Sequence, residues 1–516
     1  MPTSDAAKSN KPTTGTKKRY SKTKLGCKTC KIRKIRCDET APVCRNCIKS
    51  NRRCDGVAQP IGGPGNVTFT APLTLTYFRP TQTGWLSQDE IAYLDLFRHE
   101  LIYTIVGDSH SPAWKRMILQ AVHEEVALCH AVVAFSSLTS HIRSRPSSPS
   151  SSGSPPPGMD NEFALRHYGK ALESMRHVVH HNDSRSINTA LICTLLCICF
   201  ELRMRDIAVA LTHLEHGLQV IAGNMDSVDN AITTAFAKLD LQAAVFLGMR
   251  PPALEPDKVA SRVFVFDSVY QEADLKLMSI TNHMYRFIRG TADDFRYREQ
   301  APIPEFAFAE EVAVNAQLRA FYKKYLESVE KTSKMSVLQI ALLRIKYLTA
   351  VINMAGCLDP DETIYDRYAA EFAEIVQLAA EILHHRRQKQ SVDRADFALE
   401  MTIMQPLYVT GTKCRCPVTR RRAISLMLSA PESEGQWDST GNALVCEQVM
   451  LMEEAGIEFD LARMGAEDLL PIPQENLVHA VDIYLEPTQR RASIYLSRRL
   501  SGLDRGWHNL RQDLAW

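Results

Sequence analysis

Apolar residues recur at helical spacing through most of the chain after residue 86. This region starts with SQDE, Ser87 to Glu90, a capping-box pattern at which helices begin. Apolar faces with a period near 3.6 then appear in FALRHYGKALESMRHVV, ICTLLCICFEL, ALTHLEHGLQVI, SVLQIALLRIKYLTAVINMAG and FAEIVQLAAEILHHRR. Few segments alternate as strands do or end in hairpin turns. The pattern therefore predicts a large all-α domain over residues 87–516.

Two stretches lack this periodicity. Residues 57–86 contain Pro60, Pro64, Pro72 and Pro80, which predicts a flexible linker with no coiled-coil repeat. The run SRPSSPSSSGSPPPG predicts a disordered insertion at residues 144–158, because its composition cannot bury apolar surface. Its Ser-Pro steps are open to two interpretations, a phosphorylated segment or a tolerated surface loop.

Positive charge is concentrated at the N-terminus. The whole chain has a formal net charge of +2, whereas residues 1–54 hold 16 Lys and Arg against Asp5, Asp38 and Glu39, a local charge of +13. Such a basic head is typical of polyanion binding. Residues 1–24 are expected to form a disordered basic arm. Within it, KKRYSKTK has three open interpretations: a nuclear import signal, an arm along the DNA backbone or a generic basic tail.

Composition indicates a soluble protein kept out of oxidising compartments. The hydrophobic share is 45% and the charged share 23%, as in ordinary globular proteins. The N-terminus lacks the apolar region of a secretory signal, so the cysteines are expected to be thiols or metal ligands. The longest apolar run, Ala190 to Phe200, is about half of what crosses a bilayer. No membrane partner is expected.

Six cysteines form a duplicated array, C-x2-C-x6-C-x6-C-x2-C-x6-C, in which the second triplet repeats the first after 17 residues. They are Cys27, Cys30, Cys37, Cys44, Cys47 and Cys54. Each C-x-x-C turn places two thiolates on one tetrahedral ion, and the third cysteine completes the triplet. Two tetrahedral Zn2+ ions need eight bonds, so two of the six sulfurs must bridge. The repeat indicates that the first cysteine of each triplet is the bridging ligand. Metal binding is expected to fold a domain at residues 25–56.

The alternatives to a two-zinc site fit the cysteine spacing less well. A disulfide knot or a set of unrelated thiols does not account for a duplicated metal-type spacing in a chain without a secretion signal. A finger with one zinc needs four ligands and leaves two cysteines unused. The two-zinc interpretation uses all six.

The segment CKTCKIRKIRCDETAPVCRNCIKSNRRC resembles the binuclear zinc cluster (Zn2Cys6) transcription factors of fungi. The likeness rests on all six cysteines, the basic run between the second and third, and Pro42 before the fourth. HYGKALESMRHVV and the stretch from ICTLLCICFEL to HLEHGLQVI are also similar to the fungal-specific regulatory domain that follows many such clusters. The resemblance implies a small zinc-binding DNA reader, a linker and a helical regulatory domain over residues 87–516.

The first half of the cluster is expected to read DNA, because long basic side chains are concentrated there. In such modules a helix enters the major groove, where Lys and Arg can donate to guanine. The resemblance implies a CGG-like half-site, with Lys34 as the main base-contacting residue and Arg33 beside it. Ile32 and Ile35 are expected to pack against the cluster. Phosphate contacts are assigned to Lys28, Lys31, Arg36, Arg45, Lys49, Arg52 and Arg53.

No catalytic pattern stands out in the large domain, and no catalytic residue is assigned. The pair His213 and His216 is more often structural than metal-binding. Cys193, Cys197 and Cys199 lie in an apolar helix and are expected in the core. Cys414 and Cys416 look more exposed, so they are open to a redox-sensing role or to an ordinary structural one. Glu201 is either a surface charge or a buried anchor.

These features together predict a nuclear transcription factor of RNA polymerase II genes. Its expected cofactors are two Zn2+ ions. Its expected partners are double-stranded DNA, transcription machinery or co-regulators, and a second copy bound through the regulatory domain. The alternative is a helical small-molecule sensor or enzyme-like domain that the cluster tethers to nucleic acid.

Overall fold

The computed structural model describes two compact units, which divide between residues 79 and 80. The described residues are 26–40, 43–54, 86–107, 112–144, 161–179, 183–248, 250–254, 268–296, 302–327, 335–389, 397–431, 433–486, 489–499 and 506–516. The predicted arm at 1–24, the linker up to residue 85, Pro42 and the insertion from residue 145 lie outside these ranges.

The first unit is built around the cysteines. It has two short helices, α1 (Lys28–Ile32) and α2 (Arg45–Lys49), and its buried core consists of the cysteines themselves. A core of this kind offers almost no apolar area to stabilise a fold, which is the situation in which metal ligation supplies the folding free energy.

The second unit starts with the predicted capping box. Ser87 accepts a hydrogen bond from the amide of Glu90, whose side chain accepts one from the amide of Ser87, and α3 (Gln88–Leu96) follows. A π-helical turn, Phe97–Leu101, continues into α4 (Ile102–Val106). The helices that complete this half are α5 (Pro112–Glu124), α6 (Val126–Ser144), α7 (Glu162–Val179), α8 (Ser184–Met204), α9 (Ile207–Gly223) and α10 (Asn230–Leu247).

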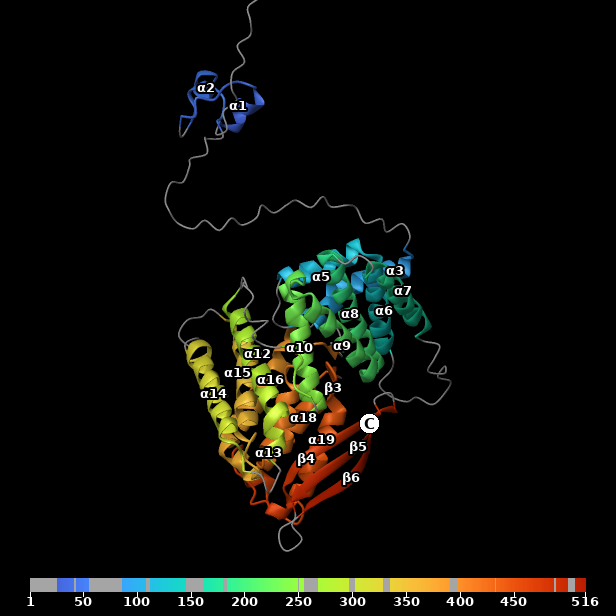
Figure 1. The fold of residues 1–516 in the computed structure, drawn as a ribbon, viewed down its shortest axis with the longest axis vertical. Helices are drawn as coiled ribbons and strands as arrows, with labels where there is room; N and C mark the ends of the chain where they lie inside the picture. The colour runs from blue at the N-terminus through green and yellow to red at the C-terminus, as the bar shows by residue number, and fades with distance from the viewer. Residues whose placement is uncertain are drawn as a thin grey trace, which may run out of the picture. The chain divides into compact units, whose positions relative to one another are not determined.

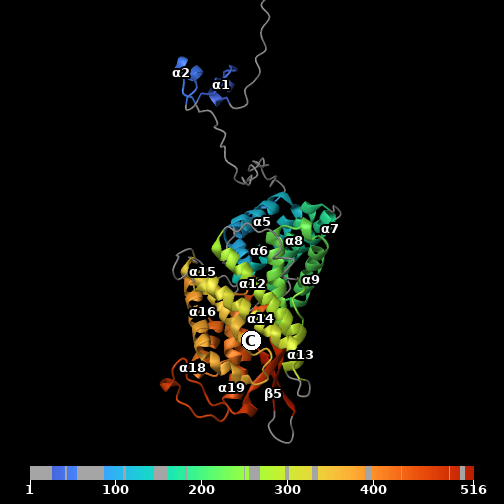
Figure 2. The same cartoon turned by 60° about the vertical axis from the view of Figure 1, so that its left-hand side comes forward.

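A second group of helices follows in the chain. They are α12 (Val269–Phe287), α13 (Asp293–Arg296), α14 (Glu305–Phe321), α15 (Val337–Ala355), α16 (Ala369–Lys389), α17 (Met404–Lys413), α18 (Pro417–Leu428) and α19 (Ser439–Glu453). The two groups surround two large apolar cores, one centred on α4–α10 and one on α12–α19. Figures 1 and 2 show α5–α9 at one end of this unit and the C-terminal strands at the other.

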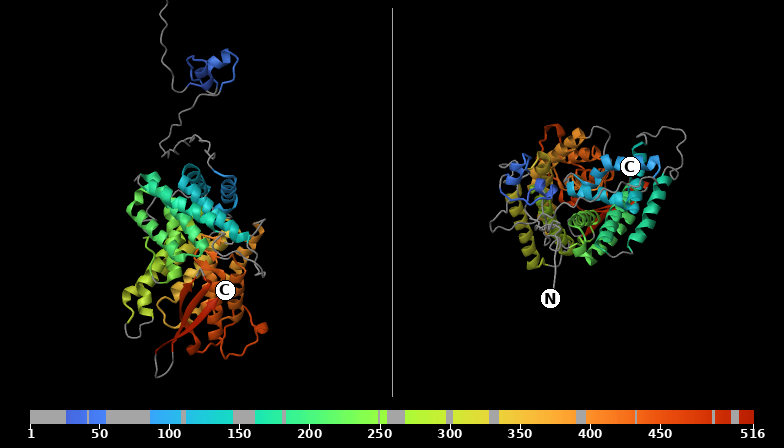
Figure 3. Two further views of the ribbon diagram at one scale, coloured as in Figure 1. Left: turned by 90° about the vertical axis from the view of Figure 1, so that its right-hand side faces the viewer. Right: turned by 90° about the horizontal axis from the view of Figure 1, so that it is seen from above.

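The C-terminus forms a sheet that the sequence pattern did not predict. Strands β4 (Val478–Glu486), β5 (Arg491–Arg499) and β6 (Trp507–Ala515) pair in order and antiparallel, and they lie side by side in Figure 3. One face packs on α19 through a small apolar core. A second, minimal sheet joins β1 (Phe397–Ala398), β2 (Ser433–Glu434) and β3 (Trp437–Asp438). The large domain is thus mostly helical, as predicted, but not all-α.

Two helices are longer and more apolar than the predicted run suggested. By length and composition, Ser184–Met204 and Val337–Ala355 would each suffice to cross a bilayer, and the bent pair α5 and α6 would add a third such segment. Both single helices contribute many side chains to the two apolar cores, for example Leu195 and Ile345. Their apolar character is used for packing within the helical unit.

Candidate zinc cluster and nucleic-acid interface

The two halves of the cysteine array fold in the same way. The side chain of Cys27 caps α1 by accepting a hydrogen bond from the amide of Cys30, and Cys44 caps α2 by accepting one from Cys47. Both distances are 3.4 Å. The first cysteine of each triplet therefore caps the short helix that carries the second, which turns both sulfurs to the same side.

Four sulfurs lie at metal-site distances. A regular tetrahedron with Zn–S bonds of about 2.3 Å has S–S edges of about 3.8 Å. The Sγ–Sγ separations are 3.7 Å for Cys27–Cys44, 3.8 Å for Cys27–Cys47, 3.6 Å for Cys30–Cys44 and 3.9 Å for Cys30–Cys47. The separations Cys27–Cys44, Cys27–Cys47 and Cys30–Cys44 match the edge expected between two sulfurs that share a tetrahedral zinc ion, and all four sulfurs lie within 4.8 Å of one another.

The other two cysteines flank this group. Cys37 accepts a hydrogen bond from the amide of Cys27 at 3.4 Å and interacts with the sulfurs of Cys27 and Cys44. Cys54 interacts with Cys27 and Cys47. All six cysteines thus gather around Cys27 and Cys44. Burial raises the pKa of the Cys27 and Cys44 thiols, so a bound cation is what would hold these sulfurs as thiolates.

Each short helix ends in a left-handed turn, at equivalent positions 17 residues apart. Lys34 has φ of 56° and Asn51 has φ of 48°. The hydrogen bonds also repeat: Ile35 N donates to Cys30 O and Arg52 N to Cys47 O, at 3.2 and 3.0 Å. Asparagine tolerates this conformation, whereas lysine is strained in it. Lys34 therefore projects from the turn after α1, just beyond the helix on which it was expected.

Arg33 joins the two halves of the module. Its Nη1 donates to the hydroxyl of Ser50 at 2.8 Å, and Ser50 is the residue equivalent to Arg33 in the second half. Thr29 adds a hydrogen bond from its hydroxyl to the carbonyl of Arg53 at 3.0 Å. The guanidinium predicted to lie beside the base-reading lysine thus has one donor committed inside the module.

Asp38 is a structural residue that the pattern of cysteines did not reveal. Its carboxylate accepts from the amides of Arg45 and Asn46 at 3.0 and 3.3 Å, which caps the start of α2. Hydrogen bonds from Thr40 and from these amides lower the pKa of Asp38 to about 2. The loop after Cys37 is thereby fixed to the second helix.

Basic side chains surround the buried sulfurs. Arg33 is half-buried. The other predicted DNA contacts are exposed: Lys28, Lys31, Lys34, Arg36, Arg45, Lys49, Arg52 and Arg53. The expected packing of two isoleucines was wrong, because Ile32 is 79% exposed and Ile35 is 41% exposed. The sulfur core is too small to cover them, so these apolar side chains share the surface with the basic residues.

Several expectations for the large domain can be compared with the structure. Cys193, Cys197 and Cys199 are buried in the core, as predicted. Cys414 and Cys416 are also buried, which corrects their predicted exposure. Arg415, which lies between these two cysteines in the chain, is also buried and forms an ion pair with Asp366 at 2.6 Å. The structure buries Glu201 as well.

The histidines have structural partners. The ring of His213 lies 2.9 Å from the hydroxyl of Tyr168, and His216 is exposed. His130, Glu90 and His167 form a buried cluster, with Nδ1 atoms of the two histidines 3.2 Å apart and His167 Nε2 3.4 Å from Glu90. These three side chains link α3, α6 and α7.

Comparison with known proteins agrees with this architecture. Residues 25–63 match the fungal Zn(2)-Cys(6) binuclear cluster domain. Residues 92–393, more than half of the chain, match the fungal specific transcription factor domain. The chain therefore belongs to the family of fungal Zn2Cys6 transcription factors, and its clustered cysteines are a binuclear zinc site.

Individual relatives resemble the chain over different extents. The aspercryptin biosynthesis cluster-specific transcription regulator atnN of Emericella nidulans is 23% identical, over 86% of this chain and 90% of that protein. The transcription regulator lscL of Purpureocillium lilacinum is 22% identical, over 41% and 53%. The adhesion and hyphal regulator 1 of Candida albicans is 62% identical over 34 residues, 7% of this chain and 5% of its own. No solved structure gives a significant match.

Proposed function

We propose that this protein is a nuclear, sequence-specific DNA-binding regulator of RNA polymerase II genes that reads a CGG-like half-site. The observation that carries the proposal is the duplicated cysteine module with exposed basic side chains around its sulfurs. Family membership supports a role in transcription regulation. The same membership favours a regulator over an enzyme, and we assign no catalytic residue.

Within the module we assign the bridging sulfurs to Cys27 and Cys44. Two tetrahedral sites that share these residues require Cys27–Cys44, Cys27–Cys47 and Cys30–Cys44 as edges, and these separations lie between 3.6 and 3.8 Å. One ion then takes Cys30 and Cys37 as its other ligands, and the second takes Cys47 and Cys54. When bound, the zinc ions fix the relative position of α1 and α2.

We assign base reading to Lys34. It is exposed on a turn that the fold keeps in a strained left-handed conformation, and such strain is concentrated at functional sites. Arg33 holds the two halves together and adds charge nearby. We assign phosphate contacts to Lys28, Lys31, Arg36, Arg45, Lys49, Arg52 and Arg53. Ile32 is exposed, and we assign to it an apolar contact with a thymine methyl group.

The experiment compares binding of the full chain to a fluorescent duplex with one CGG half-site and to the same duplex with this triplet scrambled. We expect tighter binding to the first duplex at every salt concentration. Equal affinity for both duplexes would reduce the function to unspecific binding.

Dimerisation through the regulatory domain and recruitment of co-regulators are further parts of the proposal. A second candidate function, small-molecule sensing by the helical domain, is favoured by a specific cavity in that domain. Turnover of a substrate by the full chain would instead favour the enzyme-like alternative.

A further inference from the structure

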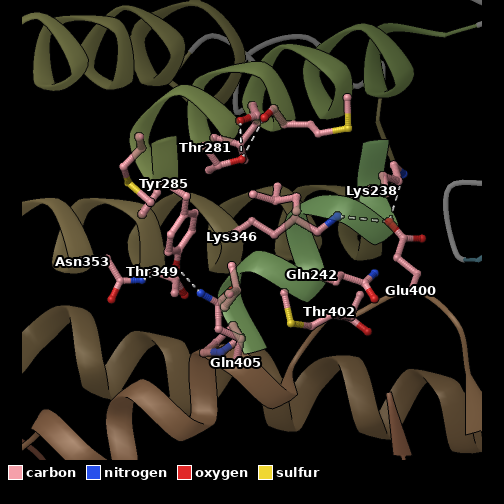
Figure 4. A pocket seen from close by; sticks show the side chains of 18 of the residues that line it. Lys238, Gln242, Thr281, Tyr285, Lys346, Thr349, Asn353, Glu400, Thr402 and Gln405 are labelled. Carbon is pink, nitrogen blue, oxygen red and sulfur yellow. Dashed lines mark hydrogen bonds and ion pairs between the residues drawn. The ribbon is translucent and has the colours of Figure 1, made fainter. Parts of the chain in front are cut away.

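A cavity of about 90 Å³ lies between α10, α12, α15 and the segment that leads into α17. Figure 4 shows the side chains that line it. Its walls come from both halves of the helical domain: Val245 of α10 packs against the core around α12–α19, and Met278 of α12 packs against the core around α4–α10. A molecule in this cavity therefore touches both cores at once.

One end of the cavity is a closed ring of charges. Lys238 lies 2.7 Å from Asp274 and 3.0 Å from Glu400, while Lys346 lies 3.0 Å from Asp274 and 3.3 Å from Glu400. Burial opposes ionisation of Asp274, but the two lysines outweigh it and hold its pKa below the usual value. Two cations and two anions balance. A charged ligand would lose its water here and find no uncompensated partner.

The other end presents a buried phenol. Tyr285 is 6% exposed, and its oxygen accepts hydrogen bonds from Asn353 Nδ2 at 3.0 Å and from Gln405 Nε2 at 2.5 Å. In Figure 4 the side chains of Tyr285 and Gln405 point toward each other. A tyrosine hydroxyl also carries one proton to donate. Within the described parts of the chain, the oxygen of this hydroxyl is the acceptor in both of its hydrogen bonds. An oxygen atom on a molecule in the cavity could therefore accept a hydrogen bond from the hydroxyl proton.

The wall between these ends is mainly apolar and adaptable. It includes Leu277, Ala350 and three methionines, Met278, Met284 and Met401. Methionine side chains are unbranched and rearrange readily around a bound group. The volume is smaller than the roughly 150 Å³ cavity that admits benzene. The space therefore admits a compact ring of at most about six heavy atoms, and only after the methionine side chains shift to enlarge it.

We propose that this cavity binds a compact, uncharged, mostly apolar molecule with one hydrogen-bond acceptor, such as a carbonyl or ether oxygen, that receives the proton of Tyr285. The binding itself goes beyond the DNA-reading function and does not depend on it. Only an effect of the occupant on transcription rests on the regulatory role proposed above. The occupant would join α10 to α12, α15 and α17 across the boundary between the two cores.

The test uses the zinc-loaded full chain and cyclopentanone as the probe, with binding followed by saturation-transfer NMR. Cyclopentane is the matched probe without an acceptor, and cyclopropanecarboxylate, which has as many heavy atoms as cyclopentanone, is the matched anion. We expect saturable binding of cyclopentanone and none of the anion. Tyr285→Phe should weaken cyclopentanone by about three- to ten-fold, the value of one hydrogen bond, and leave cyclopentane unchanged. Ala350→Leu should abolish binding of both by filling the space.

Matched controls are Tyr484→Phe and Ala370→Leu, at exposed positions outside the cavity. Circular dichroism reports whether each variant folds. If Ala350→Leu does not fold, Tyr285→Phe alone tests the proposal, because it removes only one oxygen atom. Absence of saturable cyclopentanone binding, equal affinity for the carboxylate, or unchanged binding in Tyr285→Phe would overturn the proposal. DNA affinity measured on the same samples tests the DNA-reading function separately.

Discussion

Replacing Lys34 with asparagine should separate the fold of the zinc module from its reading of DNA. Asn51 already occupies the equivalent left-handed turn in the second half, with φ of 48° against 56° at Lys34. A side chain other than Gly, Asn or Asp costs roughly 1–2 kcal/mol in this conformation. Lys34→Asn should therefore leave the module as stable as before, or more stable by about 1 kcal/mol.

The same substitution should reduce discrimination between bases. A good bidentate contact to guanine contributes about 1–3 kcal/mol of discrimination, which corresponds to about a 5- to 150-fold change in the ratio of affinities. Fluorescence anisotropy of the full chain, with a CGG duplex and with a duplex changed at one guanine, measures this ratio. Zinc content measured on the same samples shows that the cluster is intact.

Lys49→Asn provides the matched control, because it removes the same charge from an exposed position on α2. It should weaken binding to both duplexes alike and reduce the slope of log affinity against log salt by about 0.9. The assignment of Lys34 is refuted if Lys34→Asn keeps the full affinity ratio, or if the two variants cannot be told apart.

Three other predictions concern the cluster and the stability of the large domain. Cys44→Ser should reduce bound zinc below one ion per chain, whereas Cys54→Ser should retain one, as counted by native mass spectrometry; equal counts would contradict the bridging role of Cys44. Glu434 is fully buried, accepts from the amides of Thr402, Ile403 and Met404 at 2.8–3.0 Å, and pairs with Arg386 at 2.9 Å. Glu434→Ala should lower the free energy of unfolding by about 3–5 kcal/mol in denaturant titrations, and Glu434→Gln by less, since an amide oxygen still accepts; a change within error for Glu434→Ala would contradict this. Burial, with His130 nearby, lowers the pKa of His167 to about 4. Between these two pKa values the unfolded chain binds more protons than the folded chain, so the free energy of unfolding should fall as the pH drops from about 6.5 through 4. The denaturant midpoint measured against pH checks this. If His167→Gln shows the same pH dependence as the wild-type protein, this histidine is not responsible.

The zinc module was predictable because metal ligation leaves its pattern in the sequence. Spacing alone gave the two equivalent halves, and the structure places all six cysteines together. The left-handed turn at Lys34 was not predictable, since lysine disfavours that conformation and only comparison with Asn51 reveals it. Arg33 and Ser50 occupy equivalent positions of the 17-residue repeat, which the sequence shows. The hydrogen bond between their side chains could not be predicted, because the spacing of residues does not fix side-chain contacts.

In the large domain the helices followed from periodicity, and the errors have physical causes. Ala492, Ile494 and Leu496 alternate with more exposed residues along β5, so a strand signal existed in a segment assigned to a helical domain. Cys414 and Cys416 looked exposed because charged residues flank them. The charged residue between them, Arg415, is itself buried, and its charge is compensated by the ion pair with Asp366. The cavity could not be predicted at all, because its walls come from segments far apart in the chain.

The most direct test of the two-zinc DNA reader is a zinc titration of the metal-free full chain, read out as affinity for a CGG duplex. Eight metal–sulfur bonds from six cysteines require two ions that share ligands, so we predict that specific binding appears only as the second equivalent of zinc is added. We also predict that a chelator removes specific binding. Full specific affinity without zinc, or at one ion per chain, would contradict the claim that a two-zinc cluster reads the DNA.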